Sequence, residues 1–105
     1  MKIENGNIKL KRGESFAVRV GVKIDGTPYE VKRADRIRMT VKRSMLETEA
    51  PVLERTTIGG DIIKIRSDDT SRLRPGKYRY EVCLIESDGA HHIVVDPHDF
   101  EITGG

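Results

Sequence analysis

The chain has 105 residues, of which 34% are charged and 36% hydrophobic, and its formal net charge is +2. This length suits one domain with a single core, and the composition is ordinary for a soluble domain. The longest apolar run, Val82 to Ile85, is far too short to cross a bilayer, and the opening residues lack the apolar segment of a secretory signal. We therefore expect a single domain over residues 1–105, made in the cytoplasm, with no membrane segment.

Alternation of apolar and polar residues predicts strands from the start of the chain. Ile8 and Leu10 predict a short first strand, and residues 16–24 alternate as in a strand with one buried and one wet face. Asp25-Gly26 then supplies the two positive-φ residues of a type I′ hairpin turn. The residue pairs expected across this hairpin are Val22 with Tyr29 and Val20 with Val31.

The middle of the chain continues the pattern with longer connections. Residues 36–42 alternate again and predict a strand. Residues 44–54 are predicted as a long loop rather than a helical turn ended by Pro51. A strand follows at residues 63–65, and residues 67–73 are predicted as a short crossover turn in which Asp or Ser side chains cap local amides.

The C-terminal third predicts a second hairpin and a last strand. Asp88-Gly89 is expected to form a two-residue turn, and Phe100 and Ile102 mark the last strand. About seven or eight strands, with turn signals roughly every ten residues, indicate an all-β fold, a single antiparallel sandwich. The pairs expected across the second hairpin are Leu84 with Ile93, Val82 with Val95, Ile85 with His92 and Cys83 with Val94.

One motif carries a fold signature. Leu73, Pro75, Gly76 and Tyr78, followed by Tyr80, read LxPGxYxY. This resembles the corner and following strand of immunoglobulin-like and fibronectin-like sandwiches, in which a leucine plugs the end of the core and a tyrosine locks the corner. The resemblance implies an immunoglobulin-like sandwich with Leu73, Pro75, Gly76 and Tyr78 as its structural corner.

A wider resemblance covers residues 7–103. The ordered segments RGESFAVRV, DGTPYEV, IRMTVKR, DDTSRLRPGKYRYEVCLIESDG and DFEIT are similar to small immunoglobulin-like domains of tailed bacteriophages, such as the N-terminal domains of baseplate upper proteins. Such domains often carry a glycine before the final strand where this chain has Asp96 to Asp99, so the last connection is expected to differ. The resemblance implies a structural role without catalysis in a phage or prophage virion, in the tail or baseplate rather than the head. It also implies docking to other virion proteins or to further copies of the chain. The expected location is the virion, or the bacterial cytoplasm before assembly.

Charge is unevenly distributed. Residues 1–50 carry 12 basic and 7 acidic side chains, and residues 51–105 carry 7 and 10. On a strand, Arg36, Arg38 and Lys42 would point away from the apolar face with Thr40 and form a cationic stripe about 20 Å long. We call Arg36, Arg38 and Lys42 the basic stripe and expect it to meet an acidic surface on a neighbouring subunit or partner, because the two halves have opposite charge.

Other interpretations of the basic stripe stay open. The first is a solvated strand face, with Lys and Arg guarding against edge pairing. Nucleic-acid binding is disfavoured because no aromatic residue is interleaved to stack bases. A carbohydrate- or ligand-binding accessory module is a further alternative, weakened because the chain has no Trp and because Tyr78 and Tyr80 fall on the predicted core face.

No residue set predicts a metal, a cofactor or an enzyme. His91 and His92 point to opposite faces of a strand, and His92 and Asp96 would lie about 13 Å apart, so the segment with His98 is not expected to bind an ion. The chain has no nucleophile elbow, no HExxH and no phosphate loop. Cys83 is the one cysteine and is expected to be a packed or half-packed thiol.

Overall fold

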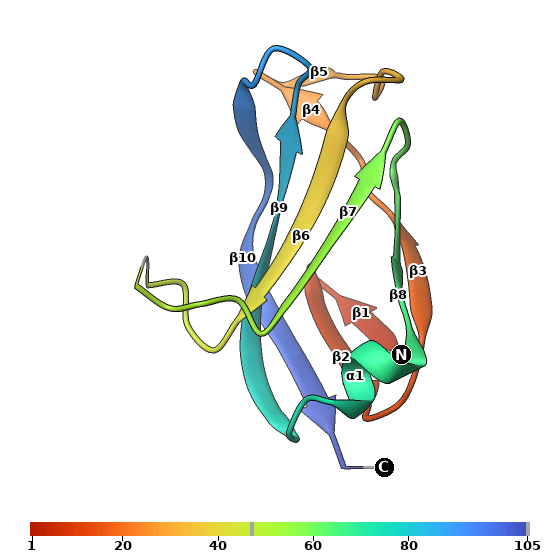
Figure 1. Cartoon of the computed structure of the whole chain (residues 1–105), viewed down its shortest axis with the longest axis vertical. Coiled ribbons are helices and arrows are strands. Elements are labelled where there is room, and N and C mark those ends of the chain that lie inside the picture. Colours follow the sequence, from red (N-terminus) through yellow and green to blue (C-terminus); the bar gives the residue numbers. More distant parts are fainter. Residues whose placement is uncertain (47, 105) are drawn as a thin grey trace.

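The computed structural model describes residues 1–46 and 48–104, which fold into a β-sandwich with one short helix. A six-stranded sheet has the order β1-β2-β10-β9-β6-β7, and a two-stranded sheet, β3-β8, lies across from it (Figure 1). A small hairpin, β4-β5, lies at one end. The elements are β1 (Lys2–Glu4), β2 (Asn7–Lys11), β3 (Phe16–Arg19), β4 (Lys23–Ile24), β5 (Thr27–Pro28), β6 (Arg36–Lys42), β7 (Leu53–Ile58), β8 (Ile62–Ile65), α1 (Ser67–Ser71), β9 (Gly76–Ile85) and β10 (His91–Thr103).

The strand order confirms the predicted all-β, immunoglobulin-like sandwich. Strands β10, β9 and β6 lie in the order of strands G, F and C of that fold, and β3 pairs with β8 as strand B pairs with E. Strand β7 extends the larger sheet beside β6. One pair departs from the purely antiparallel prediction, because β2 runs parallel to β10. In this pair Ile8 and Leu10 lie beside Phe100 and Ile102, so that four apolar side chains share the core.

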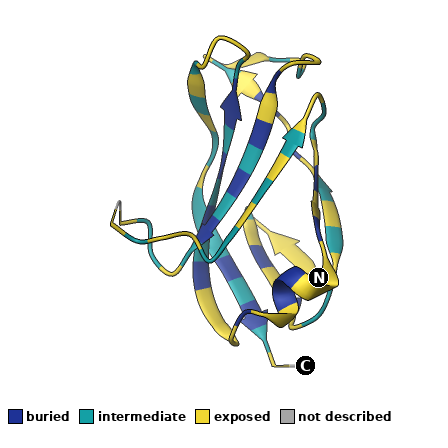
Figure 2. Cartoon of the chain, viewed as in Figure 1, coloured by how far each residue is buried: buried dark blue, intermediate teal, exposed yellow. Residues whose placement is uncertain are grey.

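The core lies between the sheets and confirms the period-two prediction for residues 36–42. Along β6, Ile37, Met39 and Val41 are buried and the residues between them are not (Figure 2). Phe100 of β10 is fully buried at the centre, with the Tyr80 ring edge-on at 6.2 Å between centroids. Burying such side chains from both sheets is what holds the two layers together.

The first predicted hairpin turn is confirmed. Asp25 and Gly26 have φ values of +51° and +78°, as a type I′ turn requires. The pairing of β4 with β5 places Val22 opposite Tyr29, and the Tyr29 amide donates to the Val22 carbonyl at 2.9 Å.

The predicted pair Val20 with Val31 is wrong. The Val20 amide donates to the carbonyl of Asp61 at 2.7 Å, on the β8 side of the molecule. Its strand therefore changes partner just before the hairpin. Sequence periodicity cannot reveal that change, because Val20 is buried with either partner.

The second predicted turn has the wrong length. The Glu86 amide donates to the Ala90 carbonyl at 2.8 Å, so three residues rather than two form the loop. Gly89 alone has a positive φ, which is the geometry of a type I turn closed by a bulge. The predicted partners of Leu84, Ile85 and Cys83 are therefore wrong by one position. A bulge after Ile93 restores the register, so the predicted pair of Val82 with Val95 is confirmed. The observed pairs are His91 with Ile85, His92 with Leu84, Ile93 with Cys83 and Val95 with Val82.

Two strands were not predicted. Strand β1 turns back onto β2 through Asn5-Gly6, both with positive φ, which is a strong sequence signal for a hairpin. Strand β7 begins at Leu53, inside the loop predicted for residues 44–54, of which residue 47 lies outside the described residues. The rest of that segment that the structure describes, from residue 44 to 52, is a loop as predicted. The last connection also differs from a glycine turn, because β10 runs on through Asp96 to Asp99 with two register shifts.

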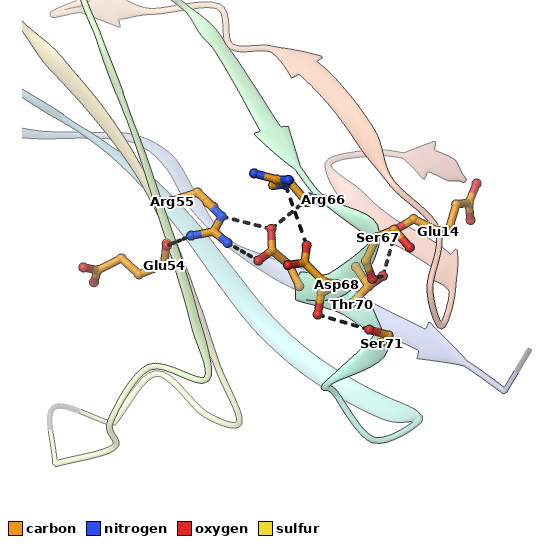
Figure 3. A network of polar contacts seen from close by, with 9 residues as sticks. Glu14, Glu54, Arg55, Arg66, Ser67, Asp68, Thr70 and Ser71 are labelled. Carbon is orange, nitrogen blue, oxygen red and sulfur yellow. Dashed lines mark hydrogen bonds and ion pairs between the residues drawn. The ribbon is translucent and has the colours of Figure 1, made fainter.

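The segment predicted as a crossover turn is the short helix α1, and it connects both sheets (Figure 3). The buried Asp69 carboxylate accepts hydrogen bonds from the Arg55 guanidinium of β7, with Nε to Oδ2 at 2.9 Å, and from the Arg66 amide at 2.8 Å. Burial alone would raise the pKa of Asp69, but the hydrogen bonds from Arg55 and Arg66 lower it overall. Next to it, the Thr70 hydroxyl donates to the Glu14 carbonyl at 2.8 Å.

The corner residues lie directly after α1. The Leu73 side chain is buried in the core, and Pro75 precedes Gly76, the first residue of β9. The Tyr78 hydroxyl donates to the Arg74 carbonyl at 2.7 Å, which is the hydrogen bond of a tyrosine corner. The corner therefore closes the core at the end where α1 packs.

Gly59, in the turn from β7 to β8, is predicted to be harder to replace than Gly26, because the backbone of Arg33 lies close to it. Its φ is +71°, and a Cβ there would lie 2.8 Å from the Arg33 carbonyl oxygen, whereas a Cβ at Gly26, with φ of +78°, would meet nothing within 4 Å. Gly26→Ala should cost about 1 kcal/mol of unfolding free energy from backbone strain alone. Gly59→Ala should cost clearly more, because the Arg33 backbone must also move. Urea unfolding of both variants measures this, and equal losses would contradict the close approach.

Candidate interaction surface

The outer face of the six-stranded sheet holds the basic stripe. Residues directly opposite one another on neighbouring strands share a face of the sheet. Arg36 lies between Ile58 of β7 and Ile85 of β9, and Arg38 lies between Thr56 and Cys83. The outer face is therefore built from three neighbouring strands, with the stripe along the middle one.

The position of the stripe excludes edge protection. Strand β6 is flanked by β9 on one side and β7 on the other, so it is not an edge strand. Arg36, Arg38 and Lys42 therefore do not guard an edge against pairing, and only the solvated strand face remains of that interpretation. Lys2 and Glu4 do lie on an edge strand, the three-residue β1, where exposed charges discourage strand addition.

Acidic residues lie close to the stripe. Arg38 Nε is 3.9 Å from Glu54 Oε1 on β7, and Glu81 of β9 lies opposite Thr40 in the next row. Below it, Arg79 Nη1 is 2.6 Å from Asp99 Oδ1. Of these two pairs, only Arg38 with Glu54 joins the two halves of the chain. The predicted contact of the stripe with an acidic partner surface stays a prediction.

Apolar side chains distinguish one end of this face. Ile58 is 71% exposed and Ile93 is 55% exposed, and the register places them on either side of Arg36 and Arg38. Between them lies Cys83, whose side chain is half-buried; burial raises the pKa of its thiol, and the nearby Arg38 partly opposes this effect. We call Arg36, Arg38, Ile58, Cys83 and Ile93 the arginine-isoleucine face.

The sequence contained part of the signal for this face. The alternation along residues 36–42 correctly placed the arginines on the outer surface. The predicted two-residue turn pairs Ile93 with Leu84 on the core face, whereas the observed three-residue turn places it opposite Cys83. No strand is predicted at Ile58, and its position beside Arg36 follows only from the pairing of β7 with β6.

A buried carboxylate holds the segment that leads into the stripe. Asp35 accepts a hydrogen bond from the Tyr29 hydroxyl and another from the Lys32 amide at 2.9 Å, and its own carbonyl accepts from the Gly59 amide at 2.9 Å. The hydrogen bond from Tyr29 is the largest reason why the pKa of Asp35 is lowered, and the same contact raises the pKa of Tyr29 to about 12. Asp35 therefore fixes where β6 begins.

The three histidines lie in different surroundings and do not share a contact. His92 Nε2 is 2.8 Å from Glu86 Oε2, His98 contacts the Asp96 carbonyl and stacks near Tyr80, and His91 is exposed. Within residues 1–46 and 48–104, no group of three or more His, Cys, Asp or Glu side chains is placed to hold a metal ion. The helix α1, with five residues, is too short to cross a membrane, and no other helix occurs in the described part of the chain.

The Asp35 contact predicts a pH dependence. A carboxyl with a lowered pKa in the folded state stabilises the fold above its unfolded pKa of about 4, and this contribution is lost as the pH falls through the folded pKa. The loss of stability in Asp35→Asn, measured by urea unfolding, should therefore be largest near neutral pH and shrink under acid conditions. Asp25→Asn, in a turn where Asn serves equally well, should show little loss at any pH. A loss for Asp35→Asn that does not change with pH would contradict this assignment.

Comparisons with known proteins give a likeness to solved structures and none to a protein family. No protein-family model matches the chain, and no curated protein sequence matches it. Among solved structures, the chain is similar to CopC from Methylosinus trichosporium OB3b, with a TM-score of 0.48 and 16% sequence identity, over 93% of this chain and 84% of that one.

Proposed function

We propose that this protein is a non-catalytic assembly module of a phage or prophage virion, of the tail or baseplate rather than the head. It docks to other virion proteins or to further copies of itself. The virion role rests on the resemblance of the motifs between residues 7 and 103. The observation in the structure that supports docking is the arginine-isoleucine face, where Ile58 and Ile93 are exposed on either side of two arginines.

The composition of this face suits a protein partner. Two exposed isoleucines lose contact with water when a partner covers them, which favours association by the hydrophobic effect. Arginine is enriched at protein interfaces because its planar guanidinium both packs and donates several hydrogen bonds. The flat outer side of a sheet leaves these groups accessible at the same time.

The alternatives are less well supported by the same surface. Carbohydrate binding calls for exposed aromatic platforms, but Tyr78, Tyr80 and Phe100 are buried, and the hydroxyl of the half-buried Tyr29 is bonded to Asp35. Nucleic-acid backbone would meet the acidic side chains that lie beside the stripe, at Glu54 and Glu81, as well as its cations.

Self-association through the arginine-isoleucine face can be tested with its own cysteine. At low salt, we expect discrete oligomers by light scattering, in which Cys83 reacts more slowly with a thiol reagent than in the dilute monomer. The triple variant Arg36→Glu, Arg38→Glu, Lys42→Glu should remain folded, lose the protection of Cys83 and form smaller assemblies at low salt, because carboxylates then replace the cations that the contact uses. Raising the salt concentration should also reduce the protection of Cys83, because salt screens the charges at the contact.

A matched triple variant provides the control. Lys64→Glu, Arg72→Glu and Arg74→Glu make the same change in net charge at exposed residues away from this face, and should leave the oligomer and the protection of Cys83 unchanged. Equal effects of the two triple variants would indicate a general charge effect rather than a docking face. A wild-type protein that is monomeric at every salt and protein concentration would contradict self-association altogether.

A further inference from the structure

The sandwich is closed along one side and open along the other. Strands β7 and β8 follow one another through the Gly59-Gly60 turn, and the Thr57 hydroxyl donates to the Ile62 carbonyl at 2.8 Å. On the other side, β3 has β8 as its one hydrogen-bonded neighbour among the described residues, and β1 has β2. Two unpaired strand edges therefore border the open side of the core.

A cavity of about 180 Å³ lies at this open side, and its walls are almost entirely apolar. It reaches the buried core and is bordered by Ile3 of β1, which is 45% exposed, and by Val18 of β3. Arg19 is the one charged residue among those that line it, and its side chain is 73% exposed. A cavity of about 150 Å³ with such walls can hold a benzene ring, so this one has room for one large aliphatic side chain.

An apolar side chain of matching size projects from the opposite side of the molecule. The connection between β6 and β7 extends away from the body of the sandwich, on the side away from β3 (Figure 1). Leu46 lies in this connection and is 64% exposed. The Glu49 amide donates to the Leu46 carbonyl at 3.0 Å, so a turn holds the leucine and a carboxylate close together.

We propose that Leu46 of one copy inserts into the cavity between β1 and β3 of the next copy. The two surfaces match in two respects, because the leucine meets apolar walls and Glu49 meets Arg19, the one cation of the cavity. Arg19 Nε is 3.7 Å from Asp61 Oδ1 in the monomer, and both side chains are well exposed, so this loose pair leaves the guanidinium accessible to a second carboxylate.

The proposed contact is head-to-tail. The loop and the cavity are different surfaces of the same chain, so each copy offers both, and repetition of the contact produces a ring if the rotation closes or a filament if it does not. This inference rests on the proposed assembly role and identifies a second copy as the partner. It differs from docking through the arginine-isoleucine face, because its main component is apolar and should persist at high salt.

Two single variants and their mixture test this arrangement. Leu46→Arg removes the inserted side chain, and Ile3→Arg places a charge at the cavity mouth; both positions are well exposed, so the core remains intact. At about 1 M salt, where the screening length is about 3 Å, the wild type should still associate and each variant should be monomeric by light scattering. An equal mixture should form dimers and nothing larger, because one variant retains the cavity and the other retains the loop.

Controls separate the contact from a general effect of the substitutions. Thr48→Arg adds the same charge two residues from Leu46 and should associate as the wild type does. In Arg19→Glu the charge match is lost and association should weaken, whereas combining it with Glu49→Arg should restore it. Variants that associate like the wild type, a mixture that stays monomeric, or a wild type that is monomeric at high salt would each overturn the inference. Protection of Cys83 at low salt would still support the proposed assembly role in any of these cases.

Discussion

The carboxylate of Asp69 ties the two sheets together, and much of the structure depends on that tie. It accepts hydrogen bonds from Arg55 on the six-stranded sheet and from the backbone of Arg66 at the end of the two-stranded sheet. A buried carboxylate has lost its hydration, so these contacts must persist while the chain is folded. Thr70, the next residue, binds the backbone between β2 and β3. One short helix therefore sets the spacing of four strands at this end of the sandwich.

The side of the sandwich between β1 and β3 is less well covered. The smaller sheet contains only β3 and β8 among the described residues, so β3 has an edge without a strand beside it. A cavity between β1 and β3 consequently extends from the surface to side chains of the core. A two-stranded layer cannot cover a six-stranded one completely, and the uncovered part leaves apolar surface near solvent. The open side is thus a direct consequence of strand number, and the proposed contact with a second copy uses it.

Ion pairs between neighbouring strands lie on the outer face of the larger sheet. Arg38 and Arg79 each lie within 4 Å of an acidic oxygen on a neighbouring strand, and such exposed pairs contribute little to stability. They do reduce the net field that the basic stripe would otherwise present. What remains distinctive is the apolar pair, Ile58 and Ile93, beside the arginines. The fold alone does not specify a function, so the proposed virion role rests on the motif resemblance, and the proposed docking rests on this surface.

Patterns among residues close in sequence were sufficient to predict much of this fold. The alternation along residues 36–42, the Asp25-Gly26 turn and the LxPGxYxY corner each concern residues close in sequence, and each depends on backbone geometry that those residues set themselves. The sequence by itself thus determined an all-β sandwich and the outward direction of the basic stripe. It did not reveal β7 or the length of the Ser87 to Gly89 turn.

Tertiary structure decided what lies beside the stripe and where the core stays open. Ile58 and Ile93 come from strands far apart in the chain, and they meet Arg36 and Arg38 only through strand pairing across the sheet. The same holds for the cavity, whose walls combine β1, β3 and the larger sheet. Pairing between distant strands depends on which apolar faces bury one another, and that is a property of the whole packed core rather than of any one segment.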